Sequence, residues 1–269
     1  MNNFIQRTLT GILFVVTVVG SILYHPVLFF LVCLLVAFVG MLELKRLLER
    51  KYDKVNLLAA LSLGLAFQLL VFLDTMDLLN QSWYVILMPI IWIPFVRELF
   101  KGGENPFQRI ALTLLVPIYV SLPMSFLYLT GWVDGEFNGF YLLGFFAMVW
   151  CNDTGAYLVG VTLGKHKLYE RISPKKTWEG FIGGVIFTFA AAYIIFKLTG
   201  LAALGVWMGA GLIISVFGTL GDLIESMLKR NVDIKDSGNI LPGHGGILDR
   251  FDAVLFSAPM VFALFVLFG

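Results

Sequence analysis

The sequence predicts an all-α, polytopic integral membrane protein. Of its 269 residues, 59% are hydrophobic and only 14% are charged, whereas soluble domains carry about 25% charged residues. A soluble domain of this length could not bury so much apolar surface, and disordered chains are poor in apolar residues. The chain also contains nine apolar stretches of about 20 residues, the length that a helix needs to cross a bilayer. A third observation, the alternation of basic connections, predicts the orientation.

The nine predicted spans fill most of the chain. The first run lies where a signal peptide would, but it is long, has no small-x-small cleavage site and leads through Pro26 into the next apolar run. We therefore expect it to be retained as a span. The spans cover roughly residues 7–24, 27–48, 55–74, 82–100, 108–130, 138–163, 178–199, 203–229 and 250–268.

The basic residues gather on one side of the predicted membrane. Eighteen of the 19 lysines and arginines lie at the N-terminus or in every second connection, and only Lys197 lies on the other side. The positive-inside rule then places the N-terminus and the basic connections in the cytoplasm. We expect a protein of the cell inner membrane with a site that faces the cytoplasm. The net charge of +1 argues against a nucleic-acid partner.

The two halves of the chain differ in glycine content. Residues 1–134 contain seven glycines and residues 135–269 contain 20. We expect the first half to be a scaffold that gives access to lipid, and the second half to pack closely and carry the chemistry. Ordinary helix packing is the simplest interpretation of the small-xxx-small spacing, which also permits a homodimer. This spacing occurs at Gly160/Gly164, Gly180/Gly184 and Gly205/Gly209.

One helical face in the eighth span carries polar and charged side chains. Asp222, Glu225, Ser226 and Lys229 are spaced so that they share one face of a helix. A structural salt bridge between Glu225 and Lys229 would leave Asp222 unexplained, and no basic residue follows Asp222 at i+4. Charges inside spans are costly and usually functional. Asp153, which follows another apolar run, belongs to the same class.

The last basic connection, residues 229–252, has the composition of a phosphate site. Gly243, Gly245 and Gly246 allow backbone N–H groups to approach a ligand, and the start of the next helix favours an anion. Asp249 and Asp252 follow one turn apart. Carboxylates beside phosphate fit a shared Mg²⁺. The alternative is a polar loop in which Asp249 merely caps the helix.

A second basic connection, residues 165–180, is less informative. Ser173 and Pro174 have the character of a helix start. Lys175 and Lys176 are equally well explained as markers of the cytoplasmic side. The sequence contains no P-loop, no dinucleotide-binding glycine motif and no His-Glu-x-x-His motif. Phosphate chemistry would therefore use the membrane-embedded site.

Several of these segments resemble one enzyme family. The residues 226–230, 235–236, 242–246 and 249–252 resemble the signature of the phosphatidate cytidylyltransferases, also called CDP-diacylglycerol synthases. Residues 151–157 and 173–180 also resemble segments of that family. The resemblance implies a nucleotidyltransferase of phospholipid biosynthesis that joins CTP to phosphatidic acid and releases pyrophosphate. It also implies that Mg²⁺ is required, and we expect that Mn²⁺ can substitute for it.

Residue roles follow from combining the resemblance with the charge pattern. We expect the metal to be held by Asp222 and Asp249, with Asp153, Glu225 and Asp252 nearby. We expect His244 to donate to the pyrophosphate. The cations expected to neutralise the substrates are Lys175, Lys176, Lys229, Arg230, Lys235 and Arg250, and Asn152, Ser226, Gly245 and Gly246 complete the expected binding set.

Two other functions share some of these features. A transporter of a phosphorylated metabolite would also bury charges among helices, but we find no internal repeat, and the charges gather towards one face. A membrane kinase for a lipid alcohol would share the need for metal and phosphate groups. It would, however, require a base to deprotonate the hydroxyl.

Overall fold

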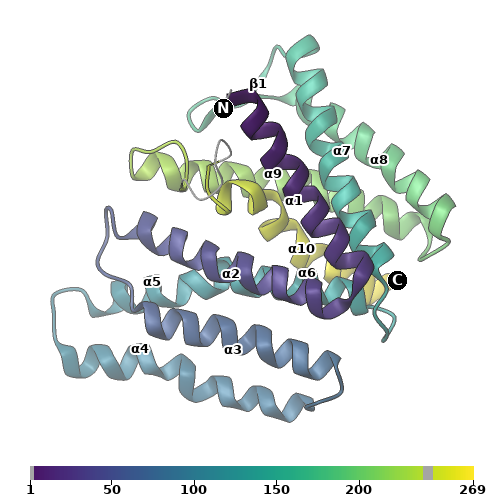
Figure 1. Cartoon of the computed structure of the whole chain (residues 1–269). Helices are drawn as coiled ribbons and strands as arrows, with labels where there is room; N and C mark the ends of the chain where they lie inside the picture. Colours follow the sequence, from purple (N-terminus) through teal and green to yellow (C-terminus); the bar gives the residue numbers. More distant parts are fainter. Residues whose placement is uncertain (1–2, 239–244) are drawn as a thin grey trace. The chain divides into compact units, whose positions relative to one another are not determined.

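The predicted all-α membrane class is confirmed. The computed structural model describes residues 3–238 and 245–269, with side chains from residue 8 onward, and within these it shows helices and one β-hairpin (Figure 1). In chain order the elements are α1 (Asn3–Tyr24), α2 (Pro26–Leu48), α3 (Leu57–Thr75), the 3₁₀-helix η1 (Gln81–Ile86), α4 (Leu87–Lys101), α5 (Pro106–Tyr119), α6 (Ser121–Leu129), the 3₁₀-helix η2 (Thr130–Trp132), α7 (Gly139–Leu163), β1 (Lys167–Tyr169), β2 (Ser173–Thr177), α8 (Trp178–Thr199), α9 (Leu204–Asn231) and α10 (Leu248–Phe268).

Eight of the nine predicted spans correspond to helical segments of spanning length in the described part of the chain. Eight helical segments in the described part of the chain are long and apolar enough to cross a membrane, and the apolar part of α1, Thr8–Tyr24, is shorter. The predicted fifth span is not one helix, because it breaks at Val120 between α5 and α6. Pro117 and Pro123 flank this break, and neither can donate the backbone hydrogen bond that a continuous helix requires.

The chain forms two compact units. The N-terminal unit comprises Met1–Tyr128 and Asn231–Arg250, and the C-terminal unit comprises Leu129–Arg230 and Phe251–Gly269. The described part of the last basic connection therefore packs with the N-terminal helices. It stays a prediction that residues 1–134 form a scaffold and that residues 135–269 carry the chemistry.

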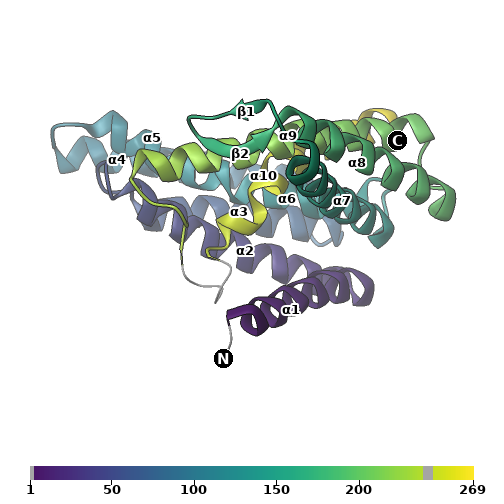
Figure 2. The same cartoon turned by 90° about the horizontal axis from the view of Figure 1, so that it is seen from above.

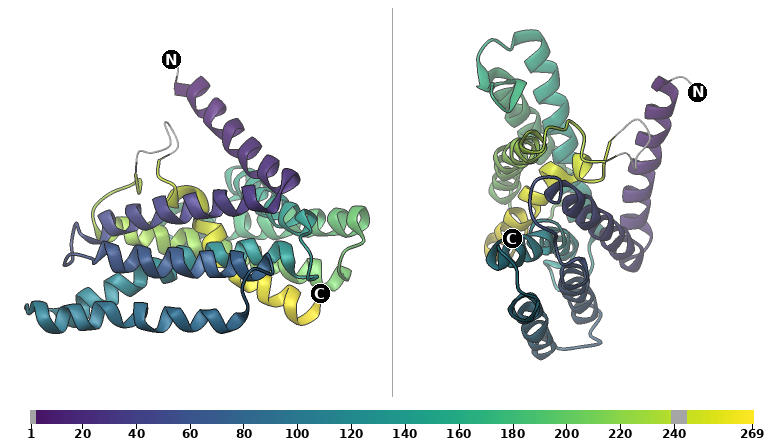
Figure 3. Two further views of the ribbon diagram at one scale, coloured as in Figure 1. Left: turned by 60° about the horizontal axis from the view of Figure 1, so that its bottom comes forward. Right: turned by 90° about the vertical axis from the view of Figure 1, so that its left-hand side faces the viewer.

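In the N-terminal unit, α3 lies between α2 and α4 (Figures 1 and 3). Phe30 of α2 stacks on Phe72 of α3 at 4.2 Å between ring centroids, and Tyr128 packs edge-on against Phe30 at 5.6 Å. Ser121 donates a hydrogen bond to the carbonyl oxygen of Gly64 at 2.6 Å. These contacts fix α2, the helix that carries Glu43, within an apolar core.

In the C-terminal unit, α7 and α8 pack through glycines, as the spacing predicts. A Cβ atom built on Gly183 would lie 2.5 Å from the Cβ of Val159 and 3.0 Å from the carbonyl oxygen of Gly155. Gly180 lies equally close to α7. At the N-terminal end of α9, by contrast, Gly205 has no neighbour within 4 Å of such an atom. The α7–α8 contact therefore depends on its glycines for close approach, whereas Gly205 is not needed for packing within the chain.

Replacement of these glycines should separate packing from backbone effects. Gly183→Ala should lower the free energy of unfolding in detergent by about 1–3 kcal/mol, because the added methyl group overlaps α7. Gly205→Ala is the matched control and should be neutral or slightly stabilising. Thermal unfolding followed by circular dichroism measures both. Equal stability of the two variants would contradict the proposed tight helix contact.

Candidate functional site

The polar face of α9 forms as the sequence predicts, but its side chains are already paired. Lys229 donates to the Oε2 atom of Glu225 at 2.9 Å, and both side chains are buried. The structural salt bridge considered from the sequence is therefore present. Ser226 donates to the Oδ1 atom of Asp222 at 3.2 Å. Asp222 lies on the same helix face but is not part of the Glu225–Lys229 ion pair.

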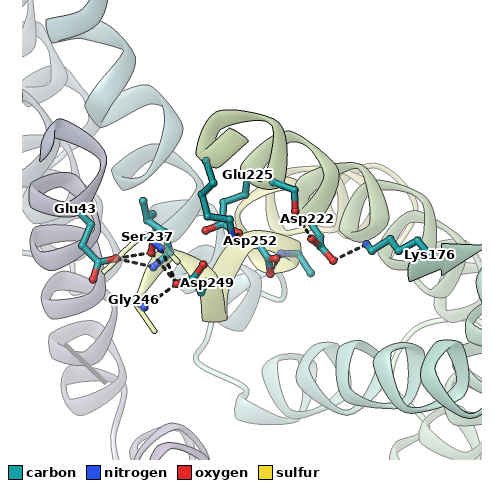
Figure 4. Close-up of polar contacts among 12 residues, drawn as sticks. Glu43, Lys176, Asp222, Glu225, Ser237, Gly246, Asp249 and Asp252 are labelled. Atoms are coloured by element: carbon teal, nitrogen blue, oxygen red, sulfur yellow. Dashed lines mark hydrogen bonds and ion pairs between the residues drawn. The ribbon is translucent and has the colours of Figure 1, made fainter. Parts of the chain in front are cut away.

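Asp222 obtains its cation from a distant part of the chain. The ammonium group of Lys176, in strand β2, lies 2.5 Å from the Oδ2 atom of Asp222. The sequence offers no basic residue at i+4, and from the sequence alone Asp222 looks uncompensated. The hairpin brings Lys176 beside α9 (Figures 2 and 4). The fold therefore supplies the partner that local spacing does not.

The hairpin itself was not predicted. Ser173 and Pro174 do not begin a helix, because residues Ser173–Thr177 pair antiparallel with β1. Thr177 instead caps α8 by accepting a hydrogen bond from the backbone N–H of Gly180 at 3.2 Å. Successive strand residues point to opposite faces. Lys176 reaches Asp222, whereas Lys175 is exposed.

In the C-terminal unit, the carboxylates of Asp153 and Asp252 interact electrostatically with the surroundings of Asp222. The carboxylate of Asp252, in α10, experiences the negative charges of Asp222 and Asp153 and the positive charge of Lys176. The backbone of Asp252 packs directly on Gly221 of α9, where a Cβ atom would not fit. We call Asp153, Asp222 and Asp252 the acidic cluster. These carboxylates and the ammonium group of Lys176 act on one another electrostatically.

Asp249 has a different setting, in the N-terminal unit. Its Oδ2 atom accepts hydrogen bonds from the backbone N–H of Gly246 at 2.7 Å, the backbone N–H of Ser237 at 3.0 Å and the Ser237 hydroxyl at 3.0 Å. Asp249 is the second residue of α10, and these three donors all lie before the helix. The Asp249 carboxylate joins residues on both sides of the segment 239–244 (Figure 4).

Sequence reasoning missed Glu43, a buried carboxylate near the end of α2. Glu43 is 1% exposed and accepts hydrogen bonds from the backbone N–H groups of Ile247 and Leu248, both at 3.0 Å. Its carboxylate also accepts from the Ser237 hydroxyl at 3.2 Å. An acidic residue inside an apolar span was the available signal.

The other predicted site residues lie in varied settings. Asn152 is buried and accepts a hydrogen bond from Thr188 of α8 at 3.4 Å, so its side chain contributes to the α7–α8 contact. Gly245 has a φ of +83°, which suits glycine, and Gly246 is buried against Ser237 and Glu43. The side chains of Arg230, Lys235 and Arg250 are exposed. His244 and Gly243 lie outside the described residues.

Comparison with known proteins identifies the family. Residues 5–268 match the cytidylyltransferase family. The chain belongs to this family. A phosphatidate cytidylyltransferase of Bacillus subtilis (strain 168) is 34% identical over 98% of both chains. That of Staphylococcus saprophyticus is 34% identical over 97% of this chain and 98% of its own, and that of Staphylococcus aureus (strain COL) is 41% identical over 67% and 68%.

The family match reaches further than the resemblance seen in the sequence. The motifs cover about residues 150–256, whereas the match also includes the N-terminal helices. The N-terminal unit is therefore part of the family's architecture, including the helix that carries Glu43.

The carboxylates have the chemistry of a Mg²⁺ site, although they do not form a ready one. Among residues 3–238 and 245–269, no group of three or more His, Cys, Asp or Glu side chains is arranged to hold a metal ion. The acidic cluster nevertheless brings three carboxylates close enough to act on one another electrostatically. Carboxylate oxygens are the protein ligands that Mg²⁺ prefers. The residues present therefore fit a divalent cation by charge and by donor type.

Proposed function

We propose that this chain condenses CTP with phosphatidic acid to CDP-diacylglycerol and pyrophosphate, as a step in phospholipid synthesis. The observation that carries this proposal is the similarity, over nearly the whole chain, to relatives named phosphatidate cytidylyltransferase. The membrane-spanning helices support it, because one substrate is a lipid. A transporter or a lipid kinase has no such support.

The proposed reaction is a phosphate-on-phosphate substitution. An oxygen of the phosphatidic acid phosphate forms a bond to the α-phosphorus of CTP, and the bond from that phosphorus to the bridging oxygen breaks. Pyrophosphate carries away the electron pair. The attacking phosphate is already ionised, so the protein does not need a strong base. The side chains would act by positioning the two anions and by neutralising their charge.

The lysines and arginines of the two units would act on the anionic substrates in different ways, some by neutralising a bound phosphate and others by attracting the substrates. We infer that Lys176 neutralises a substrate phosphate, with Asp222 holding its ammonium group in place. Lys229 would contribute a fixed charge, because Glu225 restrains it. The exposed Arg230, Lys235 and Arg250 would attract the anionic substrates. His244 is proposed to donate to pyrophosphate, and Lys175 and Asn152 keep their proposed binding roles.

A divalent cation completes the proposal. Mg²⁺, for which Mn²⁺ could substitute, would supply charge neutralisation at the triphosphate. We propose Asp222 and Asp249 as its principal ligands, with Asp153, Glu225 and Asp252 as further acidic residues. The electrostatic interaction of Asp252 with Asp222 and Asp153 supports a cation beside Asp222.

Orientation and assembly are inferred from the sequence pattern. We infer that the N-terminus and the proposed site face the cytoplasm, where CTP is found, and that the membrane is the cell inner membrane. The homodimer stays a prediction. Gly180 gives it no support, because this glycine is used in the contact between α7 and α8 of one chain.

Removal of the two principal carboxylate charges should abolish the reaction. Asp222→Asn and Asp249→Asn keep the size of the side chain but remove its charge, so each should lower product formation at least ~100-fold. Purified protein with labelled CTP and phosphatidic acid in detergent provides the assay. Asp77→Asn, at an exposed turn, is the control and should retain activity. Near wild-type turnover by both site variants would contradict the assignment and make Asp153 the next candidate.

The two lysines of the hairpin should differ in importance. Lys176→Ala should lower kcat/KM about 10-fold or more, because Lys176 faces Asp222. Lys175→Ala should have a smaller effect, because that side chain is exposed on the other strand face. Steady-state kinetics at varied CTP measures both. If neither variant differed from the wild type, both lysines would be topology markers only.

Cysteine accessibility tests the inferred orientation. In a background without Cys33 and Cys151, single cysteines at Lys51, Gly102 or Lys235 should react with an impermeant reagent only from the cytoplasmic side. Cysteines at Asp77 or Asp134 should react only from outside. The measurement is labelling of intact cells compared with inverted vesicles. Labelling of position 235 from outside would overturn both the orientation and the access of CTP.

A further inference from the structure

Glu43 is a buried acid to which the proposed reaction assigns no role. It lies near the C-terminal end of α2, among residues that are apolar and almost fully buried. A charge in such a place requires compensation. In the described part of the chain Glu43 forms no ion pair, and the nearby Lys45 pairs with Glu49 instead. Its compensation comes from hydrogen-bond donors.

The donors to Glu43 come from both sides of the segment 239–244. Ser237 precedes this segment, whereas Ile247 and Leu248 follow it. One carboxylate therefore holds both ends of the connection against α2. The backbone approaches Glu43 very closely, because a Cβ atom on Gly238 would lie 2.6 Å from its Oε1 atom, and one on Gly246 would lie 2.5 Å from its Oε2 atom.

The Ser237 hydroxyl links Glu43 to Asp249. Its oxygen lies 3.2 Å from Oε2 of Glu43 and 3.0 Å from Oδ2 of Asp249. A hydroxyl carries a single proton, so it can donate fully to only one of these carboxylates. The backbone N–H of Ser237 also donates to Asp249, at 3.0 Å. Ser237 therefore helps to hold the Asp249 carboxylate through two hydrogen bonds.

We propose that Glu43 is a positioning residue that orients Asp249 for cation binding. Through Ile247 and Leu248 it anchors the first turn of α10, which carries Asp249. Through Ser237 it offers a second acceptor, so the hydroxyl could donate to Glu43 when the Asp249 carboxylate holds a cation. The inference rests on the proposed function, in which Asp249 is a metal ligand.

The test compares Glu43→Gln with Glu49→Gln in the full chain in detergent. The amide introduced by Glu43→Gln would keep the shape of the side chain, but its NH₂ group would face a backbone or hydroxyl donor. Glu49 is a matched control, because it also accepts a backbone N–H, that of Val55 at 2.9 Å, but has no contact with Ser237 or α10. Mn²⁺ affinity, measured by electron paramagnetic resonance without nucleotide, is the primary readout, and the kcat and KM for CTP are the second.

Glu43→Gln should weaken Mn²⁺ binding at least ~10-fold and lower kcat at least ~10-fold, with KM for CTP changed less than about threefold. Glu49→Gln should stay within about twofold of the wild type in both. Equal Mn²⁺ affinity of the two variants would overturn the proposal. If Glu43→Gln does not yield folded protein, Ser237→Ala replaces it, and wild-type Mn²⁺ affinity in that variant overturns the proposal equally.

A double-mutant cycle separates this role from simple structural support. If Glu43 acts through Ser237, then Glu43→Gln combined with Ser237→Ala should weaken Mn²⁺ binding no more than the stronger single variant. Additive losses would contradict the coupling. A wild-type protein that binds Mn²⁺ but forms no CDP-diacylglycerol would overturn the proposed function alone, because Mn²⁺ affinity would still report the action of Glu43.

Discussion

The need to compensate charge among apolar helices underlies the polar structure of this protein. An unpaired ion in such surroundings costs several kcal/mol, so each buried acid takes a partner of its own. Glu98 is 6% exposed and accepts from Arg109 at 2.6 Å, and Glu225 accepts from Lys229 at 2.9 Å. Glu43 instead takes backbone and hydroxyl donors. The partners of these buried acids connect particular segments, as Glu43 connects α2 with the start of α10.

Helix α10 carries an acidic residue of each polar group. Asp249, in its first turn, belongs to the network of Ser237 and Glu43 in the N-terminal unit. Asp252 follows three residues later on the same helix face and belongs to the acidic cluster of the C-terminal unit. The two acids therefore belong to separate polar groups.

The hairpin and the glycine contacts show how tight packing serves the polar groups. Thr177 ends β2 and caps α8, so the start of α8 fixes the strand that carries Lys176. Gly164, which directly follows α7, lies close to Thr177 and so holds the base of the hairpin against α7. A glycine also allows close packing where Asp252 lies on Gly221. Any side chain at position 221 would move α10 away from α9.

The sequence by itself determined the class of protein, the positions of the spans and the family. Apolar stretches of about 20 residues are local features that need no knowledge of the fold, and so are the motifs that resemble the family signature. The pairing of Glu225 with Lys229 could also be considered, because helix geometry fixes the i, i+4 spacing.

Only the tertiary structure revealed the hairpin, the Lys176–Asp222 ion pair and the Glu43 network. Ser173 and Pro174 are compatible with a helix start, and only pairing with β1 makes their segment a strand. Lys176 and Asp222, or Glu43 and Leu248, are far apart in the chain, and no local periodicity predicts that they meet. The partner of a buried charge is chosen by the packing of whole helices, which a single sequence does not specify.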